Sequence, residues 1–268
     1  MQRIISVDER KCIHCGLCIK DCLSDCLEFN PERIPVYSQD GKEKCVACQH
    51  CFAICPTGAL SFGGLYSEDS QPICFGNSEE LLAMIKSRRS IRRFRDDNIP
   101  QNQLDKIIDM LGYPPIGGNR PCLHFSIVNG KEKMQEIVKV SYEKIAERRG
   151  DDGLLNFMHD SYQKGQDFIY RNAPAMIVSA IDKSKAIAGC ETTDPIIALS
   201  YLDLYAYSLG LGVLWCDAAL YVAERIPEVR DLLKIPEGYS LGYVLMLGVP
   251  AVQYTRTVQK KAASVTVL

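Results

Sequence analysis

The chain has 268 residues, which is long enough for two domains or for a small domain joined to a large one. Its 31 basic and 33 acidic residues give a formal net charge of −2, and this balance excludes a general nucleic-acid-binding protein. The apolar content of 47% is ordinary for a soluble globular protein, and no apolar run reaches membrane-spanning length. The N-terminus carries no signal-peptide core. We therefore expect a cytoplasmic protein with neither a membrane nor a nucleic acid as partner.

Thirteen cysteines stand out, and eight of them form two runs with the same spacing, C-x2-C-x2-C-x3-C. The first run consists of Cys12, Cys15, Cys18 and Cys22, and the second of Cys45, Cys48, Cys51 and Cys55. Pro56 follows the second run. This pattern, which covers about residues 1–62, resembles the bacterial two-cluster ferredoxins, in which the fourth cysteine of each run ligates the other cluster.

The spacing also has a physical reason. A tight loop brings every third side chain to the same side, so three thiolates can hold one iron–sulfur cube whose fourth ligand comes from elsewhere. We therefore expect two [4Fe–4S] clusters, the first held by Cys12, Cys15, Cys18 and Cys55 and the second by Cys22, Cys45, Cys48 and Cys51. Zinc held by paired C-x2-C elements is the alternative, and a disulfide framework fits less well.

The first run departs from the ferredoxin pattern at one place. Leu23 stands where proline usually follows, and Cys26 comes shortly after it. We expect Cys26 to be a packed thiol, with ligand exchange as the alternative. His14 and His50 lie inside the cluster loops and could tune the cluster potentials by hydrogen bonding to sulfur, although exposed loop histidines are the plainer interpretation.

Beyond the cysteine runs, residues 63–78 are rich in glycine, serine and acidic residues and are predicted to form a linker. Residues 79–268 are predicted to form a second domain. Helices are predicted, in chain order, at 79–87, 101–111, 131–148, about 152–171 and 194–209, with a short one inside 227–238. Strands are predicted at 123–130, 174–182, 212–217 and 239–249. Strands separated by helices indicate an α+β or α/β layer structure.

The stretch SRRSIRRFRDDNIP (87–100) carries four arginines within six residues, directly after a predicted helix. Guanidinium groups form paired hydrogen bonds with phosphate oxygens, so a phosphate site is one interpretation and a solvated basic surface is the other. Arg93 and Arg95 are expected at the surface. The chain has neither a P-loop nor a G-x-G-x-x-G after a strand, which argues against Walker-type ATP binding and a Rossmann fold.

Five segments in order resemble the flavin-dependent nitroreductase family over about residues 79–261. They are RRSIRRF (88–94), PPIGGNRPCLHF (114–125), NAPAMIVSA (172–180), DPIIALSYLDLYAYSLGLGVLWCD (194–217) and IPEGYSLGYVLMLGVPAVQYTRTVQKK (235–261). The resemblance implies an α+β fold with a central sheet surrounded by helices. It also implies a homodimer that binds FMN at the subunit interface.

The resemblance further implies which residues contact the flavin. Contacts to its phosphate, ribityl chain or pyrimidine edge would come from Arg88, Arg89, Ser90 and Arg92, with Arg256, and more weakly Lys260, closing on the phosphate. The flavin ring would be lined from the other subunit by Pro115, Ile116, Gly117 and Asn119. The backbone near the reactive flavin nitrogen would be that of Trp215, Cys216 and Asp217. A packed aromatic residue is the alternative interpretation of Trp215.

These patterns predict an FMN oxidoreductase that takes electrons through two [4Fe–4S] clusters to FMN and on to a small oxidised acceptor, such as a nitroaromatic or a quinone. The electrons would come from a low-potential donor such as ferredoxin, flavodoxin or a reductase. Catalytic side chains are left unassigned, because the cofactor is expected to carry the chemistry. A non-enzymatic electron carrier or redox sensor acting on a protein partner is the alternative. The sequence leaves open the physiological acceptor, the direct use of NAD(P)H and the direction of electron flow.

Overall fold

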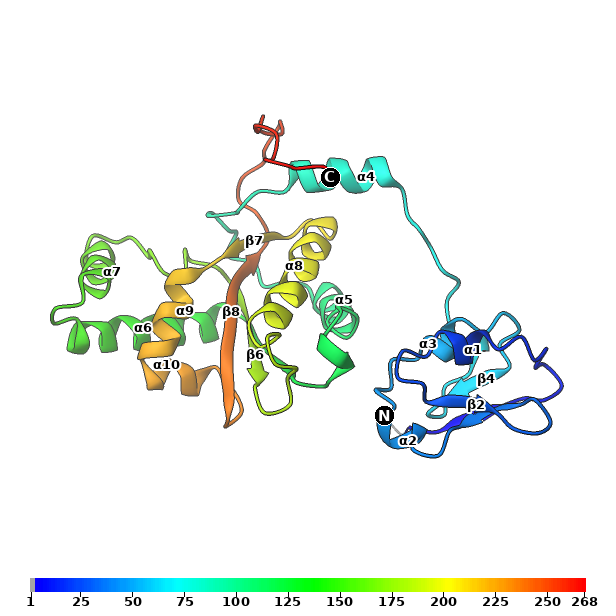
Figure 1. Ribbon diagram of the computed structural model, residues 1–268. Coiled ribbons are helices and arrows are strands. Elements are labelled where there is room, and N and C mark those ends of the chain that lie inside the picture. Colours follow the sequence, from blue (N-terminus) through cyan, green and yellow to red (C-terminus); the bar gives the residue numbers. More distant parts are fainter. Residues whose placement is uncertain (1–2) are drawn as a thin grey trace. The chain divides into compact units, whose positions relative to one another are not determined.

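The computed structural model describes residues 3–268, which divide into two compact units between Phe75 and Gly76 (Figure 1). This boundary lies inside the segment 63–78 that the sequence predicts as a linker. No helix in the described part of the chain is both long and apolar enough to cross a membrane.

The first unit consists of two antiparallel strand pairs with single-turn helices between them. β1 (Ile5–Val7) pairs with β4 (Leu60–Phe62), and β2 (Leu27–Phe29) pairs with β3 (Pro35–Tyr37). The helical turns are α1 (Leu17–Lys20), α2 (Gly41–Lys44), α3 (His50–Ala53) and the 3-10 turn η1 (Ser67–Asp69). The buried core of this unit is small and consists of Cys18, Cys26, Leu27, Phe52, Leu60 and Phe62.

The two cysteine runs share one backbone conformation. His14 and Gly16 in the first run have φ angles of 56° and 72°, and the equivalent Ala47 and Gln49 in the second have 54° and 62°. Each run then enters a four-residue helix, α1 or α3. Left-handed residues bend the chain sharply, so the repeated spacing of the sequence becomes a repeated loop in the structure.

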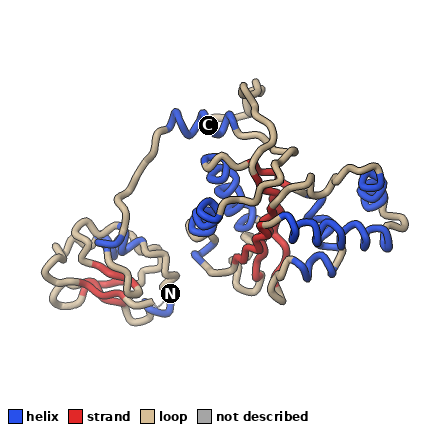
Figure 2. The backbone as a smooth tube through the Cα atoms, turned by 180° about the vertical axis from the view of Figure 1, so that it is seen from behind, coloured by secondary structure: helices blue, strands red, loops and turns tan. Residues whose placement is uncertain are grey.

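The second unit has a four-stranded antiparallel sheet with the order β5-β6-β8-β7. Figure 2 shows these strands between the helices of the unit. Its strands are β5 (Leu123–Asn129), β6 (Ala175–Asp182), β7 (Gly212–Trp215) and β8 (Tyr239–Gly248). Its helical elements are α4 (Ser78–Ser87), α5 (Gln101–Met110), η2 (Gly117–Asn119), α6 (Lys131–Arg148), α7 (Gly153–Gln163), α8 (Thr193–Ser208), α9 (Asp217–Arg225) and α10 (Pro227–Leu232). The antiparallel sheet decides between the two layer structures in favour of α+β.

Helices cover both faces of this sheet, α5 and α8 on one side and α6, α9 and α10 on the other (Figure 1). Successive side chains of a strand point to opposite faces, so β6 and β8 must be apolar at almost every position. Leu245 and Leu247 accordingly join the core beneath α5 and α8, while Val244 and Met246 join the core on the other face. All four are completely buried.

Two elements differ from the sequence-based prediction. The helix expected over about 152–171 ends at Gln163, because Gly165 has a φ of 78° and the Asp167 carboxylate then accepts the Tyr170 and Asn172 backbone N–H groups. Residues 166–172 therefore form a turn. The strand expected over 212–217 ends at Trp215, since helix α9, which the sequence did not predict, begins at Asp217.

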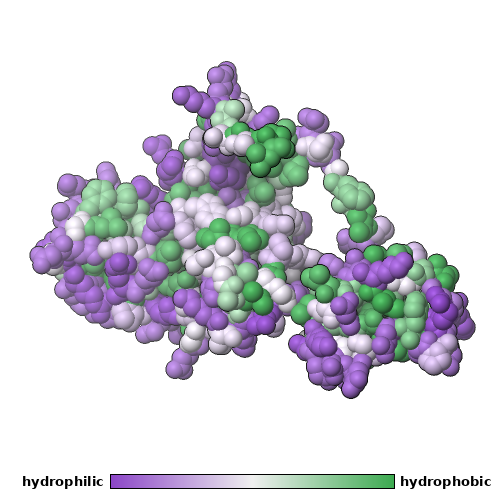
Figure 3. Space-filling view, in the orientation of Figure 1, coloured by the Kyte–Doolittle hydropathy of each residue, from purple (hydrophilic) through white to green (hydrophobic). Residues whose placement is uncertain are grey.

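Helix α4 begins the second unit and has no buried residue. Asn77 caps its N-terminus by accepting the Glu79 and Glu80 backbone N–H groups. Three large apolar side chains of this helix are about half exposed: Leu81, Leu82 and Ile85. Figure 3 shows the resulting hydrophobic surface on α4.

Candidate functional site

A small cavity in the first unit is lined by cysteines from both runs. Cys12, Cys15 and Cys18 of the first run meet Cys55 of the second, and the remaining lining is largely apolar. Among residues 3–268, no three His, Cys, Asp or Glu side chains converge closely enough to hold a single metal ion. The four cysteines line one cavity and come from both runs, which is the combination of ligands expected for a cube in which each iron takes one thiolate.

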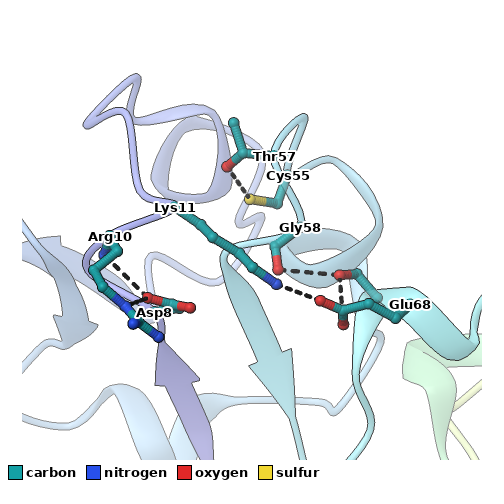
Figure 4. Close-up of polar contacts among 8 residues, drawn as sticks. Asp8, Arg10, Lys11, Cys55, Thr57, Gly58 and Glu68 are labelled. Carbon is teal, nitrogen blue, oxygen red and sulfur yellow. Dashed lines mark hydrogen bonds and ion pairs between the residues drawn. The ribbon is translucent and has the colours of Figure 1, made fainter.

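The Thr57 hydroxyl lies next to the Cys55 sulfur (Figure 4). Burial raises the pKa of Cys55, but hydrogen bonds from the Leu60 backbone, the Thr57 side chain, and the Ala59 and Thr57 backbone together outweigh this effect, and the net pKa is below its ordinary value. Thr57 Oγ1 lies 3.8 Å from the sulfur. Nearby, Lys11 forms an ion pair with Glu68 of η1. Because iron binds the thiolate, this environment favours the form of Cys55 that serves as a ligand.

Cys26 supports the loop that carries Cys22. Its side chain is 2% exposed, as expected for a packed thiol, and its backbone N–H donates to Cys22 Sγ at 3.3 Å. Its carbonyl accepts the Ser38 N–H at 3.0 Å. A Cβ at Gly41 would lie only 2.0 Å from the same carbonyl oxygen. The backbone of Cys26 is therefore as closely engaged as its side chain.

Tyr37 lies beside the cysteines assigned to the second cluster. Its hydroxyl oxygen is buried without a hydrogen bond of regular geometry. Burial, and then the neighbouring Cys45 sulfur, raise the pKa of Tyr37. The Ala47 backbone N–H donates to Cys45 Sγ at 3.4 Å. Burial, with a further contribution from Cys48, raises the pKa of Cys51 to about 11.

The two loop histidines contact other groups. His14 Nδ1 lies 2.9 Å from the Arg33 carbonyl oxygen, and His50 Nδ1 lies 3.4 Å from the Asp21 carboxylate. Both side chains are exposed. The Nδ1 atom of each histidine thus lies next to an oxygen, and the suggestion that these side chains tune the cluster potentials stays a prediction.

In the second unit, the arginine segment is attached to the edge of the sheet. The Ile91 backbone N–H donates to the Val213 carbonyl of β7 at 2.9 Å, and Ser90 lies opposite Val213. This approach requires glycine at position 212, because a Cβ there would lie 2.5 Å from Ile91 Cγ1. The segment is thereby held next to the strand that ends at Trp215.

A buried carboxylate joins the arginine segment to the end of β7. Asp203 of α8 is 5% exposed, and its Oδ2 accepts a hydrogen bond from Trp215 Nε1 at 2.9 Å. The same oxygen lies 3.1 Å from Arg88 Nη1. Arg88 Nη1 is buried and has this ion pair as its polar contact, whereas Arg89 Nη2 is buried without a hydrogen-bond partner. An unsatisfied guanidinium nitrogen such as Arg89 Nη2 is available to an anion.

A groove of about 300 Å³ opens where β7 ends. It is lined by Arg92, by Leu214 to Ala218, and by residues of α7 and the following turn, including Arg171. Cys216 is packed rather than reactive, because its thiol donates to the Ile169 carbonyl at 3.1 Å and burial raises its pKa to about 11.

Two neighbours fix the other residues at this end of β7. The Tyr243 hydroxyl donates to Asp217 Oδ1, and the Tyr243 ring lies 5.1 Å from the Trp215 ring at an angle of 57°. Burial, and then the Asp217 carboxylate, raise the pKa of Tyr243. Trp215 is therefore a packed aromatic residue that also borders the groove.

The remaining residues expected at the flavin lie elsewhere. The Gly117 backbone N–H donates to both carboxylate oxygens of Asp194, at 3.2 and 3.1 Å, and Asp194 is 2% exposed. The segment 115–119 is thus anchored to the start of α8. Arg256 is exposed, with its Nη1 3.5 Å from Thr255 Oγ1. Within residues 3–268, neither this segment nor Arg256 lines the groove.

Comparison with known proteins identifies both units. The sequence pattern of the nitroreductase family matches residues 85–249, which is more than half of the chain. This chain belongs to the nitroreductase family. A 4Fe-4S dicluster domain matches residues 11–59, which favours iron–sulfur clusters over the zinc alternative.

Similar proteins support this assignment to the nitroreductase family. A protein of Methanothermobacter thermautotrophicus named as an NADH dehydrogenase/NAD(P)H nitroreductase is 30% identical over 173 residues, which cover 64% of this chain and 78% of that protein. A Bacteroides fragilis nitroreductase with bound FMN gives a TM-score of 0.58 at 25% identity, covering 72% of this chain and all of that chain. A Desulfitobacterium hafniense nitroreductase with bound FMN gives a TM-score of 0.56 at 26% identity, covering 70% of this chain and 98% of that chain. The predicted fold and family are confirmed.

Three residues of this nitroreductase-family chain were missed in the sequence: Asp194, Asp203 and Tyr37. Both aspartates lie in the otherwise apolar stretch that forms α8. A carboxylate within an apolar helix is rarely buried unless it is paired, so each could have been singled out as a residue in need of a partner. Tyr37 gives no comparable signal, because a tyrosine in a strand is common.

Proposed function

We propose that this chain is an FMN-dependent oxidoreductase that receives electrons through two [4Fe–4S] clusters and delivers them to a small oxidised acceptor, such as a nitroaromatic or a quinone. One observation carries the proposal. A single chain combines a cavity lined by four cysteines with a buried, unsatisfied guanidinium nitrogen, Arg89 Nη2, in the segment next to the strand that borders a groove. When bound, the clusters supply one-electron transfer and the flavin couples it to two-electron chemistry.

The residues of the first unit fit two clusters. The first would be held by Cys12, Cys15, Cys18 and Cys55, which line one cavity, and the second by Cys22, Cys45, Cys48 and Cys51. Backbone N–H groups already donate to Cys22 and Cys45. Such hydrogen bonds stabilise the negative charge of a thiolate and of the cluster that it holds.

The residues of the second unit fit a flavin phosphate. Arg88 and Arg89 would donate to its oxygens, which would satisfy the buried Nη2 of Arg89, and the Ser90 hydroxyl would add a further donor. Arg92, at the groove, would stabilise negative charge on the reduced ring. The backbone of residues 215–217 would border the ring, and Arg256 would close on the phosphate. The FMN-bound nitroreductases from B. fragilis and D. hafniense support this choice of flavin.

A homodimer would complete the site. Pro115, Ile116, Gly117 and Asn119 do not line the groove of their own chain, so a second copy would supply them. The exposed apolar side chains of α4 are surface that such a dimer would cover. A low-potential donor would reduce the clusters of the first unit. Because the first unit is covalently joined to the second, the effective concentration of the electron donor at the flavin would be raised.

The test is anaerobic purification of the full chain, with iron, sulfide and flavin measured per chain. We expect about eight irons and one FMN. Eight irons without flavin would contradict the proposal. The FMN-loaded chain should then reduce small acceptors when supplied with reduced ferredoxin. Rapid flavin reduction without turnover of any acceptor would indicate an electron carrier, and undiminished NAD(P)H-driven turnover after mutation of cluster ligands would exclude the cluster route.

A further inference from the structure

Asp203 is an unusual residue for its position in the fold. Its neighbours on α8, Leu199, Leu202 and Ala206, are completely buried in the core beneath α5. A carboxylate among such residues loses its hydration and is stabilised only if charged or polar partners replace the water. Asp203 has two such partners, and both contact the same oxygen, Oδ2.

The two partners come from separate parts of the chain that meet at the expected flavin site. Arg88 follows the last residue of α4, and Trp215 is the last residue of β7. One carboxylate oxygen, 3.1 Å from the guanidinium and 2.9 Å from the indole nitrogen, fixes the position of each relative to the other. Tyr243 supports the ring of Trp215. Without Asp203, Arg88 would lose its only ion-pair partner among the described residues.

Asp203 also brings a negative charge to the wall of the groove, through its contact with Trp215. The flavin ring gains negative charge when it is reduced, and nearby cations stabilise that charge. The Asp203 carboxylate opposes this stabilisation, because it contacts Trp215, whose backbone would border the ring, and a negative charge acts strongly in a medium of low dielectric constant. The expected consequence is a more negative reduction potential for the bound flavin.

We propose that Asp203 is a positioning residue of the flavin site, which holds Arg88 and Trp215 in place and makes the bound flavin a stronger reductant. The proposal rests on the function proposed above. Its chemistry needs no contact between Asp203 and the flavin, since the carboxylate acts through the two side chains that it holds.

Two substitutions distinguish the positioning role of the Asp203 side chain from the effect of its charge. Asp203→Asn keeps an acceptor for Trp215 Nε1 and removes the charge, while Asp203→Leu removes both. Asp109→Asn is the matched control, because Asp109 is exposed on the neighbouring helix α5. Trp215 is the only tryptophan of the chain, so its fluorescence reports the Asp203 contact directly. Three quantities are measured on the full chain: the Trp215 emission, the FMN dissociation constant and the flavin midpoint potential.

We expect Asp203→Asn to leave the emission maximum unchanged and to shift the flavin potential to a more positive value. Asp203→Leu should shift the emission and raise the FMN dissociation constant about tenfold or more. Asp109→Asn should change none of the three quantities. If Asp203→Leu fails to fold, the potential of Asp203→Asn decides alone, because this substitution preserves the volume of the side chain.

The inference is overturned if the wild-type chain binds FMN and Asp203→Asn has the same flavin potential as Asp109→Asn. It is also overturned if Asp203→Leu folds and retains the wild-type emission and FMN affinity. A wild-type chain that binds no FMN refutes the proposed function and the flavin part of this inference together. The emission of Asp203→Leu would in that case still show whether Asp203 holds Trp215.

Discussion

The two units of the chain bury their apolar residues in different ways. In the first unit, the packed cluster of buried residues is small, and it includes Cys18 and Cys26, which lie within or next to the cluster runs. In the second, helices cover both faces of a sheet, and the groove at the expected site opens at the edge strand β7 and borders one of the two cores. A unit as small as the first rarely stabilises itself by hydrophobic burial alone, and bound metal commonly supplies the difference. The proposed cluster site is therefore part of the interior of the first unit, whereas the proposed flavin site lies at the border of a core built by the sheet and its helices.

The largest expected effect follows directly from this difference. Removing iron with a chelator under reducing conditions should unfold the first unit and leave the second folded. Limited proteolysis with mass spectrometry should then degrade residues 3–75 and spare most of residues 76–268. Hydrogen exchange supplies an independent measurement. The comparison between the units fails if the iron-free first unit stays protected against hydrogen exchange and proteolysis, or if both units lose this protection together.

A single ligand should matter far more than a neighbouring packed thiol. Cys55→Ala should remove the first cluster, so that the iron content falls from about eight to about four per chain. Cys26→Ala is the control, since Cys26 is buried beside the cluster loops but is not assigned as a ligand. Iron analysis and EPR spectra of both variants provide the measurement. A loss of iron in Cys26→Ala would show that Cys26 serves as a ligand.

Arginine substitutions should weaken flavin binding without unfolding the second unit. Arg89→Leu removes a guanidinium with a buried, unsatisfied nitrogen, and Arg93→Leu, at an exposed position, is the control. A hydrogen bond to a charged group contributes about 1.5–3 kcal/mol, so the FMN dissociation constant of Arg89→Leu should rise by about 10- to 100-fold. Fluorescence titration with FMN measures both variants. Equal affinity in the two would remove Arg89 from the flavin site.

A smaller effect is expected at Tyr37. Its hydroxyl lies beside the Cys45 sulfur, and a hydrogen bond to sulfur stabilises the more negative, reduced state of a cluster. Tyr37→Phe should therefore make the potential of the second cluster more negative and leave that of the first in place. Redox titrations followed by EPR would show this, with the exposed Tyr66→Phe as control. Equal shifts of both clusters would indicate a general structural change instead.

The smallest effect concerns an exposed ion pair of the second unit. Arg148 binds Glu228 through two contacts of 2.8 and 2.9 Å, and this hydrogen bonding lowers the pKa of Glu228 from 4.5 to about 2. The pair therefore stabilises the fold fully above pH 4.5, and the stabilisation is lost as the pH falls towards about 2. The Tm difference between wild type and Glu228→Gln should shrink over that range. Glu224→Gln, whose carboxylate lies 3.7 Å from Arg225, should show little such dependence.

The fold and the first site could be predicted because their signals are local. Each cysteine run carries its own spacing, and left-handed residues at equivalent positions bend both runs in the same way. The helical pattern likewise predicted the bounds of α8 to within one residue at each end, because Gly210, with a φ of 78°, marks where the helix stops. In contrast, α9 was missed because its N-terminal cap is the Cys216 sulfur, which accepts the Ala219 N–H and is not a residue that signals a helix start.

The contacts that complete the second site could not be predicted, because they join segments far apart in the sequence. Asp203 meets Arg88 and Trp215 only after the sheet has adopted the order β5-β6-β8-β7, and nothing in a helical pattern specifies that order. Asp194 reaches Gly117 for the same reason. Local patterns therefore indicated the segments of the proposed site, and tertiary packing selected the side chains that hold these segments.

The close approach of Gly41 to the Cys26 carbonyl has a consequence for how this chain can evolve. Any side chain at position 41 would collide with a backbone atom, which cannot rotate away. Substitutions of Gly41 are therefore not expected to be tolerated during evolution. Position 26 is less restricted, because its engagement with Ser38 and Cys22 uses backbone groups that every residue except proline can supply. A selection from chains randomised at both positions should return glycine alone at 41 and several small residues at 26. The invariant member of the pair would then be the residue without a side chain, and the cysteine would be the replaceable one.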